Sequence, residues 1–272
     1  MPYRFLKLLL VAMTVLVTSC TSTSEDLITQ AMKNPTLPIQ ETELYDPLRT
    51  FAAARADFYD VATYNTYAHR VSRNAAVRVQ LDYGWTMIQG SGTYFKWKGE
   101  RFVVTAAHLF AFGGDRILES EAFITTPQEK VLGKLVYIDK EVDIAIFAVS
   151  SLPSRKAANF HRADGYEIGE QAIYSGFPGP NKLLTFSGTL SGEGYGTDIT
   201  MHSFAWPGSS GSGVFNEKGE FVGVVVAIMV GGGPMGPQLI GSVVYVAPAT
   251  LIDSSYLLSN LRKAKDKKNA GF

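Results

Sequence analysis

The chain has 272 residues, of which 46% are hydrophobic, so it is long enough to bury a substantial core in one large domain or two small lobes. Its formal net charge is zero and only 18% of its residues are charged, which excludes a bulk electrostatic attraction to nucleic acid or to anionic lipid. The 26 glycines and 16 phenylalanines are typical of a β-rich protein with many tight turns.

Residues 1–19 have the features of a signal peptide. Arg4 and Lys7 precede an apolar run, Leu8–Val17, that is too short to cross a membrane. Ten helical residues span only about 15 Å, which is half of the thickness of a bilayer core. A signal sequence therefore fits this segment better than a membrane-spanning helix.

The signal ends in the letters VTSC, which resemble a bacterial lipobox. This resemblance implies cleavage before Cys20 and lipidation of Cys20, palmitate included, so the domain would be anchored on the cell envelope. Thr21, in place of an aspartate, favours the outer membrane of a Gram-negative cell; in other cells we expect the outer face of the cell membrane. Cys20 is the only cysteine, so we expect no disulfide in the exported chain. An ordinary secretory signal with a chance cysteine is the alternative.

Two segments precede the expected domain. Residues 20–46 are rich in Ser, Thr and Pro, which is typical of a flexible tether. Residues 47–72 begin with an Ala-rich stretch whose apolar residues have roughly helical spacing, which predicts a helical extension. This helix can pack on the domain, join two copies of it, or inhibit it by crossing a cleft.

Residues 73–262 have a different pattern and are predicted to form one all-β domain. Short runs rich in β-branched and aromatic residues alternate with Gly, Pro and Asn. Such runs predict a barrel or sandwich, and hairpin turns are clearest at Lys98–Gly99 and Asn216–Gly219. A helix is predicted near the end of the domain, from the letters ATLIDSSYLLSNLRKAK, and residues 263–272 are predicted to be a polar tail.

The order of candidate catalytic residues excludes one class of serine hydrolase. All four histidines, His69, His108, His161 and His202, precede the serine-rich stretch around Ser210. Hydrolases built on an α/β sheet need the chain order Ser, Asp, His, which is impossible here. Their G-x-S-x-G motif also fails, because the second residue after the candidate serine is again a serine.

The order His, Asp, Ser finds better candidates. His108 follows the strand-like letters RFVVTAA, and Asp143 opens the strand-like letters DIAIFAV. Asp143 follows His108 by 35 residues and precedes Ser210 by 67. An activated serine needs a base within hydrogen-bond reach and a carboxylate that orients this base. Each residue alone has a structural explanation, but the three together in this order favour a catalytic triad.

The flanking letters TAAH, DIAIF and GSSGSGVFNEKGEFVGV resemble the signature segments of trypsin-like, chymotrypsin-fold serine proteases. The letters GSGTYF and YSGFPG resemble the bacterial branch that contains the glutamyl endopeptidases and the periplasmic heat-shock proteases. The similarity covers about Ala75 to Leu261. It implies two six-stranded antiparallel β-barrels with the active site between them, and no PDZ domain is expected after them.

This resemblance assigns roles to individual residues. Ser210 would be the nucleophile, His108 the general base and then acid, and Asp143 the carboxylate that orients it. The backbone N–H groups of Gly208 and Ser210 would form the oxyanion hole. Ser209 stands where mammalian relatives have an aspartate that pairs with a new N-terminus, so activation by that ion pair is not expected.

The resemblance also places the primary specificity pocket. Its expected lining residues are Phe204, Ala205, Val225, Val226, Ala227 and Ile228. None is acidic, so we expect no preference for a basic P1 residue. Glutamyl endopeptidases carry a histidine at the place of Val225, so a preference for glutamate is not expected either, although His202 can lie at the rim. Small or medium apolar P1 residues fit best. Met229–Pro237 is predicted to be a mobile loop beside the cleft.

The leading interpretation is an exported, lipid-anchored serine endopeptidase that acts on polypeptides. A protease fold used as an idle binding or chaperone-like module on a membrane surface is the main alternative, and an esterase with the same triad is a weaker one. We expect no cofactor, no nucleic-acid partner and no metal, because the single cysteine and scattered histidines have no metal-ligand spacing.

Overall fold

The computed structural model describes residues 66–82, 87–110, 120–179, 181–233 and 236–269. Residues Val61–Phe272 form one compact unit. The unit before it, Met1–Asp60, lies outside the described residues, and with it the predicted signal peptide, the tether and most of the predicted extension 47–72. Among the described residues, no helix has both the length and the apolar character needed to cross a membrane.

Nearly all of the described elements are strands. In chain order they are α3 (Tyr67–Ala75), β1 (Ala76–Asp82), β2 (Met87–Trp97), β3 (Glu100–Ala106), η2 (Ala107–Phe110), β4 (Glu121–Thr125), β5 (Lys130–Asp139), β6 (Ile144–Ala148), β7 (Ala158–Asn159), β8 (Gln171–Gly176), β9 (Leu184–Glu193), β10 (Ile199–His202), β11 (Gly213–Asn216), β12 (Phe221–Gly233), β13 (Gly236–Pro248), η3 (Ala249–Leu251) and α4 (Ser254–Asn269).

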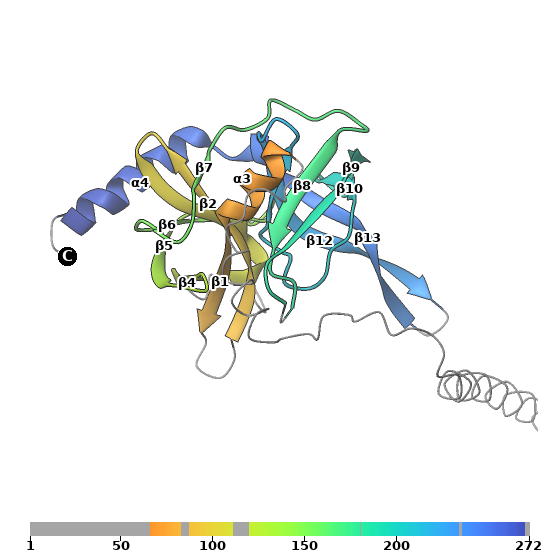
Figure 1. Cartoon of the computed structure of the whole chain (residues 1–272), viewed down its shortest axis with the longest axis horizontal. Coiled ribbons are helices and arrows are strands. Elements are labelled where there is room, and N and C mark those ends of the chain that lie inside the picture. Colours follow the sequence, from red (N-terminus) through yellow and green to blue (C-terminus); the bar gives the residue numbers. More distant parts are fainter. Residues whose placement is uncertain (1–65, 83–86, 111–119, 180, 234–235, 270–272) are drawn as a thin grey trace, which may run out of the picture. The chain divides into compact units, whose positions relative to one another are not determined.

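The strands form two closed barrels, as Figure 1 shows. The first has the order β1-β4-β5-β6-β3-β2 and closes through the pairing of β1 with β2. The second has the order β10-β13-β12-β11-β8-β9. Both are antiparallel, and the two-residue strand β7 is added to the first barrel in parallel with β2. The predicted pair of six-stranded antiparallel barrels is therefore confirmed.

Both predicted hairpin turns are present. Lys98 and Gly99, between β2 and β3, have φ values of 48° and 85°, the left-handed values that a two-residue hairpin turn needs. Asn216 ends β11, and Gly219, with φ of 78°, brings the chain back into β12.

The predicted loop at Met229–Pro237 is wrong, because β12 and β13 continue through it. Their ladder runs from Met229 opposite Ile240 to Gly233 opposite Gly236. Glycine and proline indicated a loop in the sequence. Backbone pairing of two long strands holds the segment in a hairpin nevertheless.

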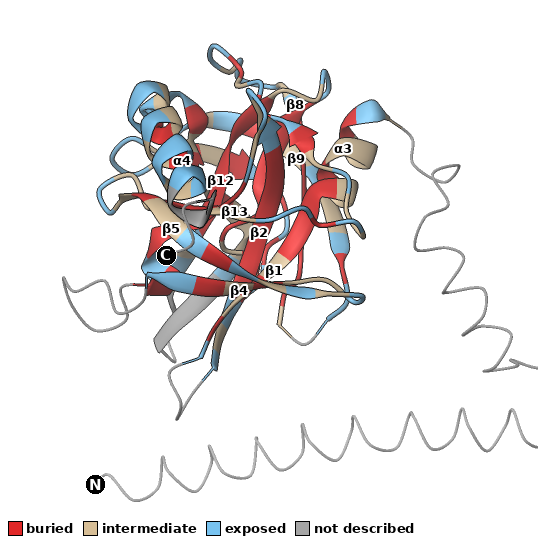
Figure 2. Ribbon diagram, turned by 90° about the vertical axis from the view of Figure 1, so that its left-hand side faces the viewer, coloured by how far each residue is buried: buried red, intermediate tan, exposed pale blue. Residues whose placement is uncertain are grey.

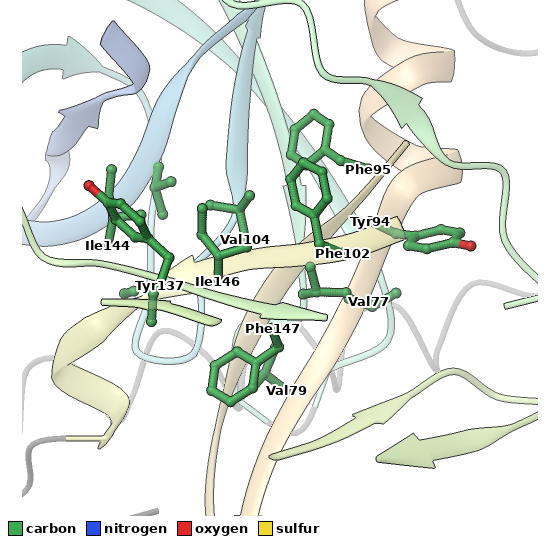
Figure 3. Packing of buried hydrophobic residues seen from close by; sticks show 14 of the residues in the cluster. Val77, Val79, Tyr94, Phe95, Phe102, Val104, Tyr137, Ile144, Ile146 and Phe147 are labelled. Atoms are coloured by element: carbon green, nitrogen blue, oxygen red, sulfur yellow. The ribbon is translucent and has the colours of Figure 1, made fainter. Parts of the chain in front are cut away.

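The hydrophobic core of the first barrel extends into the second. Figure 3 shows Phe95 and Phe102 among the buried aliphatic residues of the first barrel. The ring centroid of Phe95 lies 4.7 Å from that of Phe221 and 6.0 Å from that of Phe215, and both partners belong to the second barrel. Full burial of one such side chain stabilises a fold by about 1.5–3 kcal/mol. This shared core fixes the barrels against each other.

Two helices pack on the barrels. In α3, which begins at the Thr66 cap and ends at Ala75 rather than at the predicted residue 72, the Oγ of Ser72 donates to the Oγ of Ser175 in β8 at 2.9 Å. The predicted C-terminal helix is α4, whose first turn is capped by Asp253. Figure 2 shows its outer face exposed, while Leu257 and Leu261 are buried in the shared core.

Candidate active site

Strand register brings His108 and Asp143 together. In the antiparallel pair β3–β6, Ala106 lies opposite Ile144, so the residues that follow β3 meet the residues that precede β6. The N–H of Ala107 continues this pairing by donating to the carbonyl of Asp143 at 3.1 Å. His108 then lies in the short helix η2, at the surface, with Asp143 beside it.

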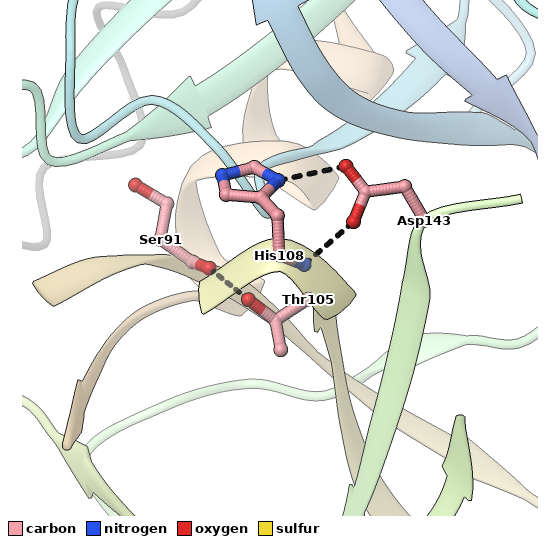
Figure 4. Close-up of polar contacts among 4 residues, drawn as sticks. All are labelled: Ser91, Thr105, His108 and Asp143. Atoms are coloured by element: carbon pink, nitrogen blue, oxygen red, sulfur yellow. Dashed lines mark hydrogen bonds and ion pairs between the residues drawn. The ribbon is translucent and has the colours of Figure 1, made fainter. Parts of the chain in front are cut away.

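The carboxylate of Asp143 contacts His108 through both oxygens (Figure 4). Its Oδ1 accepts from the backbone N–H of His108 at 2.7 Å, and its Oδ2 lies 2.7 Å from the ring Nδ1. A carboxylate only accepts, so Nδ1 carries a proton in this contact. A neutral ring held in this way would have Nε2 available to accept a proton.

Asp143 adopts a backbone conformation that few residues tolerate. Its φ is 60°, in the left-handed region, where aspartate is several times more frequent than most non-glycine residues. Strain of this kind is concentrated at functional sites. In this structure, one residue contacts the short helix η2 with its carbonyl and with both carboxylate oxygens.

Ser210 lies in a loop between β10 and β11. Most backbone polar groups of this loop are hydrogen-bonded, but two N–H groups are not. All four carbonyls from Pro207 to Ser210 accept a hydrogen bond, from Gly179 N (2.8 Å), Ser91 Oγ (2.7 Å), Ser212 N (3.0 Å) and Ser91 N (2.8 Å), in chain order. The N–H of Ser209 donates to the carbonyl of Trp206 at 2.9 Å. The N–H groups of Gly208 and Ser210 have no partner among the described residues.

Backbone polar groups without a partner are rare in folded proteins, so a matched pair is informative. The peptide between Pro207 and Gly208 is trans, because the described residues contain no cis bond. Its carbonyl points toward Gly179, so the N–H of Gly208 points the other way. The Gly208 and Ser210 N–H groups are therefore the two donors of this loop that are left without a partner among the described residues.

Gly208 is required at its position for two reasons. Its φ is 98°, and a Cβ atom there would lie 2.7 Å from the backbone N of Gly179. Gly179 is itself the residue that holds the carbonyl of Pro207. A side chain at residue 208 would thus push against the contact that orients the loop from Trp206 to Ser212, which we call the oxyanion loop.

Ser91 of β2 joins the two halves of the site. Its N–H donates to the carbonyl of Ser210, and its own carbonyl accepts from Thr105 Oγ1 at 2.7 Å, in the strand that leads to His108 (Figure 4). A Cβ on the adjacent Gly90 would contact both Leu109 and the carbonyl of Ser210. The half-buried Ser210 has no hydrogen bond from its Oγ to His108 among the described contacts.

A family model for the trypsin-like peptidase domain matches residues 90–224, the range that contains His108, Asp143 and Ser210. The chain contains a trypsin-like peptidase domain. Curated relatives named "Serine protease HtrA-like", from Staphylococcus aureus strains USA300 and NCTC 8325, are 30% identical to it over 157 residues. The match covers 51% of this chain and 20% of each relative, so the chain spans about a fifth of their length.

Solved structures support the same fold for the peptidase domain. The serine endoprotease from Yersinia pestis has a TM-score of 0.55 at 17% identity, over 71% of this chain and 65% of that one. The HtrA-type protease AlgW with tripeptide has a TM-score of 0.53 at 20% identity, over 67% and 58%. The active form of Rv3671c protease from M. tuberculosis has a TM-score of 0.53 at 18% identity, over 74% and 87%.

The residues expected to line the specificity pocket of the peptidase domain are divided by the structure. Ala205 and Val225 are buried in the core of the second barrel, Val226 is buried in the shared core, Ile228 is half-buried, and Phe204 and Ala227 are exposed. A bulge in β12 between Val225 and Ala227 shifts the register of this strand against β13. The accessible side chains of the set are Phe204, Ala227 and Ile228.

Ser209 is buried inside the peptidase domain. Its Oγ accepts from the N–H of Trp206 at 3.4 Å, and the hydroxyl of the buried Tyr174 bonds the Ser209 side chain and the carbonyl of Phe204. Burial raises the pKa of Tyr174 well above its usual range. Neutral hydroxyl groups therefore occupy the interior behind the oxyanion loop.

The sequence analysis missed three residues near this site. Ser91 and Gly179 hold the oxyanion loop, and both lie in segments, GSGTYF and YSGFPG, that carry the family resemblance. Asp198 lies close enough to Asp143 for the two charges to interact; burial first, and the negative charge of Asp143 second, raise the pKa of Asp198. No sequence pattern pointed to this proximity.

The other histidines lie away from these contacts. His69 is on α3, with its Nε2 3.0 Å from Ser187 Oγ, and His161 and His202 are exposed. Within the described ranges, no group of three or more His, Cys, Asp or Glu residues is placed to hold a metal ion.

Proposed function

We propose that the domain is a serine endopeptidase that cleaves peptide bonds through an acyl-enzyme. The proposal is carried by two observations together: the N–H groups of Gly208 and Ser210 have no partner among the described residues, and Asp143 contacts Nδ1 of His108. Donors placed in advance for an oxyanion are the largest single contribution to many acyl-transfer reactions.

In this mechanism Ser210 Oγ attacks the carbonyl carbon of the substrate while His108 Nε2 takes the hydroxyl proton. The carbonyl oxygen becomes an oxyanion and accepts from the N–H groups of Gly208 and Ser210. His108 then gives the proton to the leaving amine as the C–N bond breaks. A water molecule repeats the sequence on the ester and releases the acid. Hydrogen bonds between nucleophile and base often tighten only when substrate binds.

We further propose that an extended peptide pairs with β12. This strand pairs with β11 only as far as Val224, and from Ala227 to Gly233 it pairs with β13 alone among the described strands. A free strand edge is a common way to bind a peptide backbone. Phe204, Ala227 and Ile228 carry no charge, which favours small or medium apolar P1 residues such as Val, Ala or Leu. The tripeptide in the AlgW structure is in accord with a peptide ligand.

A fluorophosphonate probe tests the proposal, because it labels only an activated serine. The purified full-length protein should be labelled, and Ser210→Ala should lose all labelling. Ser209→Ala and Ser212→Ala are the matched controls. Ser212 Oγ is buried without a hydrogen-bond partner among the described residues, so its removal should cost little.

No labelling of the parent protein would contradict the proposed activity and favour the idle binding module. Labelling that survives in Ser210→Ala would show that Ser210 is not the nucleophile. Rapid cleavage of small esters without cleavage of peptides with apolar P1 residues would favour an esterase.

Export and lipid anchoring are a separate proposal, which rests on the sequence of residues 1–21 alone. We propose that the chain is cleaved before Cys20 and lipidated on it. Mass spectrometry of the N-terminal peptide should find a diacylglyceryl cysteine that Cys20→Ala lacks. A mature N-terminus at any other residue would overturn this proposal.

A further inference from the structure

Every polar atom of Ser91 is engaged by the residues around the oxyanion hole. Its Oγ donates to the carbonyl of Gly208 at 2.7 Å and accepts from the N–H of Phe177 at 2.8 Å. Its N–H donates to the carbonyl of Ser210 at 2.8 Å, and its carbonyl accepts from Thr105. The side chain is fully buried, so no water replaces these contacts cheaply.

The two contacts of Ser91 with the loop lie on either side of Ser209, at the carbonyls of Gly208 and Ser210. The Gly208 carbonyl belongs to the peptide that follows the first oxyanion donor, and the Ser210 carbonyl belongs to the peptide that follows the second. A trans peptide is planar, so a fixed carbonyl also fixes the direction of the N–H in the same peptide group, which belongs to the next residue. The directions of the neighbouring donors, Gly208 N–H and Ser210 N–H, then depend on only a few backbone angles.

We propose that Ser91 is the positioning residue of the oxyanion hole: its hydroxyl and N–H together hold the loop so that both donors face the reacting carbonyl. The proposal rests on the proposed peptidase function. Ser91 acts through Gly208 and Ser210 and does not touch the substrate. Its effect should therefore appear in the transition state, where the oxyanion exists, and much less in substrate binding.

A purely structural serine provides the matched control. Ser175 in β8 is similarly buried, and its Oγ also has two hydrogen-bond contacts, here with side-chain hydroxyl groups: Ser72 Oγ at 2.9 Å and Thr185 Oγ1 at 3.0 Å. Neither contact involves the oxyanion loop. Ser175→Ala and Ser91→Ala remove the same atoms from comparable surroundings, so the two substitutions should cost similar stability but differ in catalysis.

The first test compares steady-state kinetics of the parent, Ser91→Ala, Ser91→Cys and Ser175→Ala on a peptide p-nitroanilide with an apolar P1 residue. We expect kcat of Ser91→Ala to fall about tenfold, less than the roughly 100- to 1000-fold that follows loss of an oxyanion donor itself, with KM changed less than twofold. Ser91→Cys keeps a weak donor and should lie between. A peptide boronate, whose tetrahedral adduct occupies the oxyanion hole, should lose affinity in parallel with kcat.

The proposal is overturned if Ser175→Ala lowers kcat as much as Ser91→Ala does. It is also overturned if Ser91→Ala changes only KM, or if boronate affinity is unaffected. Thermal melting of each variant separates these outcomes from simple loss of fold.

The second test needs no activity, so it separates failure of this proposal from failure of the proposed function. Hydrogen exchange is measured by mass spectrometry in the Ser210→Ala background, on peptides that span Trp206 to Gly213. Adding Ser91→Ala should speed exchange of the bonded amides of this loop, and adding Ser175→Ala should not. Faster exchange in a parent that neither labels nor cleaves would keep the positioning role and reject the peptidase. Unchanged exchange would reject the positioning role.

Discussion

The two barrels contribute to the candidate site by different physical means. The first barrel supplies His108 and Asp143, whose geometry depends on one carboxylate and on side chains that remain partly exposed to water. The second supplies the loop from Trp206 to Ser212, which contains no ionisable side chain and is held by hydrogen bonds to its main-chain carbonyls. One half is organised by side-chain chemistry, and the other is organised by the path of the main chain.

This difference predicts how each half fails. The histidine half should fail when a single functional group changes its hydrogen-bonding character while the backbone stays in place. The loop half should tolerate changes of functional group, except at Ser210, and should fail when a new Cβ atom or a lost anchor moves the main chain.

The largest effect that distinguishes the two halves is expected for Asp143→Asn. The backbone N–H of His108 needs an oxygen, so the amide oxygen of asparagine would face it and the NH₂ group would face Nδ1. Nδ1 would then have to accept, which moves the ring proton to Nε2 and removes the base. We expect kcat to fall by about 10⁴-fold with little change in melting temperature. A fall of less than tenfold would contradict the assigned tautomer.

A smaller but still large effect is expected for Gly208→Ala. The new Cβ would meet the backbone of Gly179 at 2.7 Å in a left-handed conformation, and displacement of the first oxyanion donor should lower kcat by roughly 100- to 1000-fold. Gly99→Ala is the control, because Gly99 also has positive φ but nothing lies within 4 Å of its Cβ position. That variant should lose about 1–2 kcal/mol of stability and keep its kcat. Equal kcat in both variants would argue against a backbone-built hole.

The smallest effect concerns charge near the histidine half. Burial and the charge of Asp143 raise the pKa of Asp198, so the folded state binds this proton more tightly than the unfolded chain does. The free energy of unfolding therefore decreases as pH rises from the ordinary carboxyl pKa through the raised one. Asp198→Asn should remove this loss.

Urea unfolding at about pH 3 and at pH 7 measures the effect of Asp198→Asn. The variant should be more stable than the parent at pH 7. The difference should vanish at about pH 3, where Asp198 of the parent is protonated in both the folded and the unfolded state. A difference that is the same at both pH values would show that the charge of Asp198 is not its cause.

The strand-like runs predicted an all-β domain, and the resemblance to trypsin-like proteases predicted the two barrels. His108 and Asp143 could be singled out because each lies in a short local pattern next to a strand. The sequence did not predict the partners of the oxyanion loop. Ser91 and Gly179 approach that loop only when two barrels have closed, and no spacing along the chain encodes such an approach. The bulge between Val225 and Ala227 was likewise not predicted from the sequence.

The hairpin at Met229–Pro237 shows that local turn signals in a sequence can also mislead. Glycine and proline are reliable signals of a turn when the chain is considered locally. Here pairing along two 13-residue strands outweighs these local preferences. The loop prediction failed because β propensity depends on what the partner strand offers, which the local letters do not contain.

The contact between Ser91 and Gly208 joins residues that are 117 positions apart in the chain, and this separation has a consequence for the time at which the site is completed. Chains are synthesised from the N-terminus, and long-range contacts form after local ones because closing a long loop costs entropy. The first barrel can emerge from the ribosome and fold while Ser210 has not yet been made. We therefore expect the contact between Ser91 and Gly208 to form late in folding, after the first barrel.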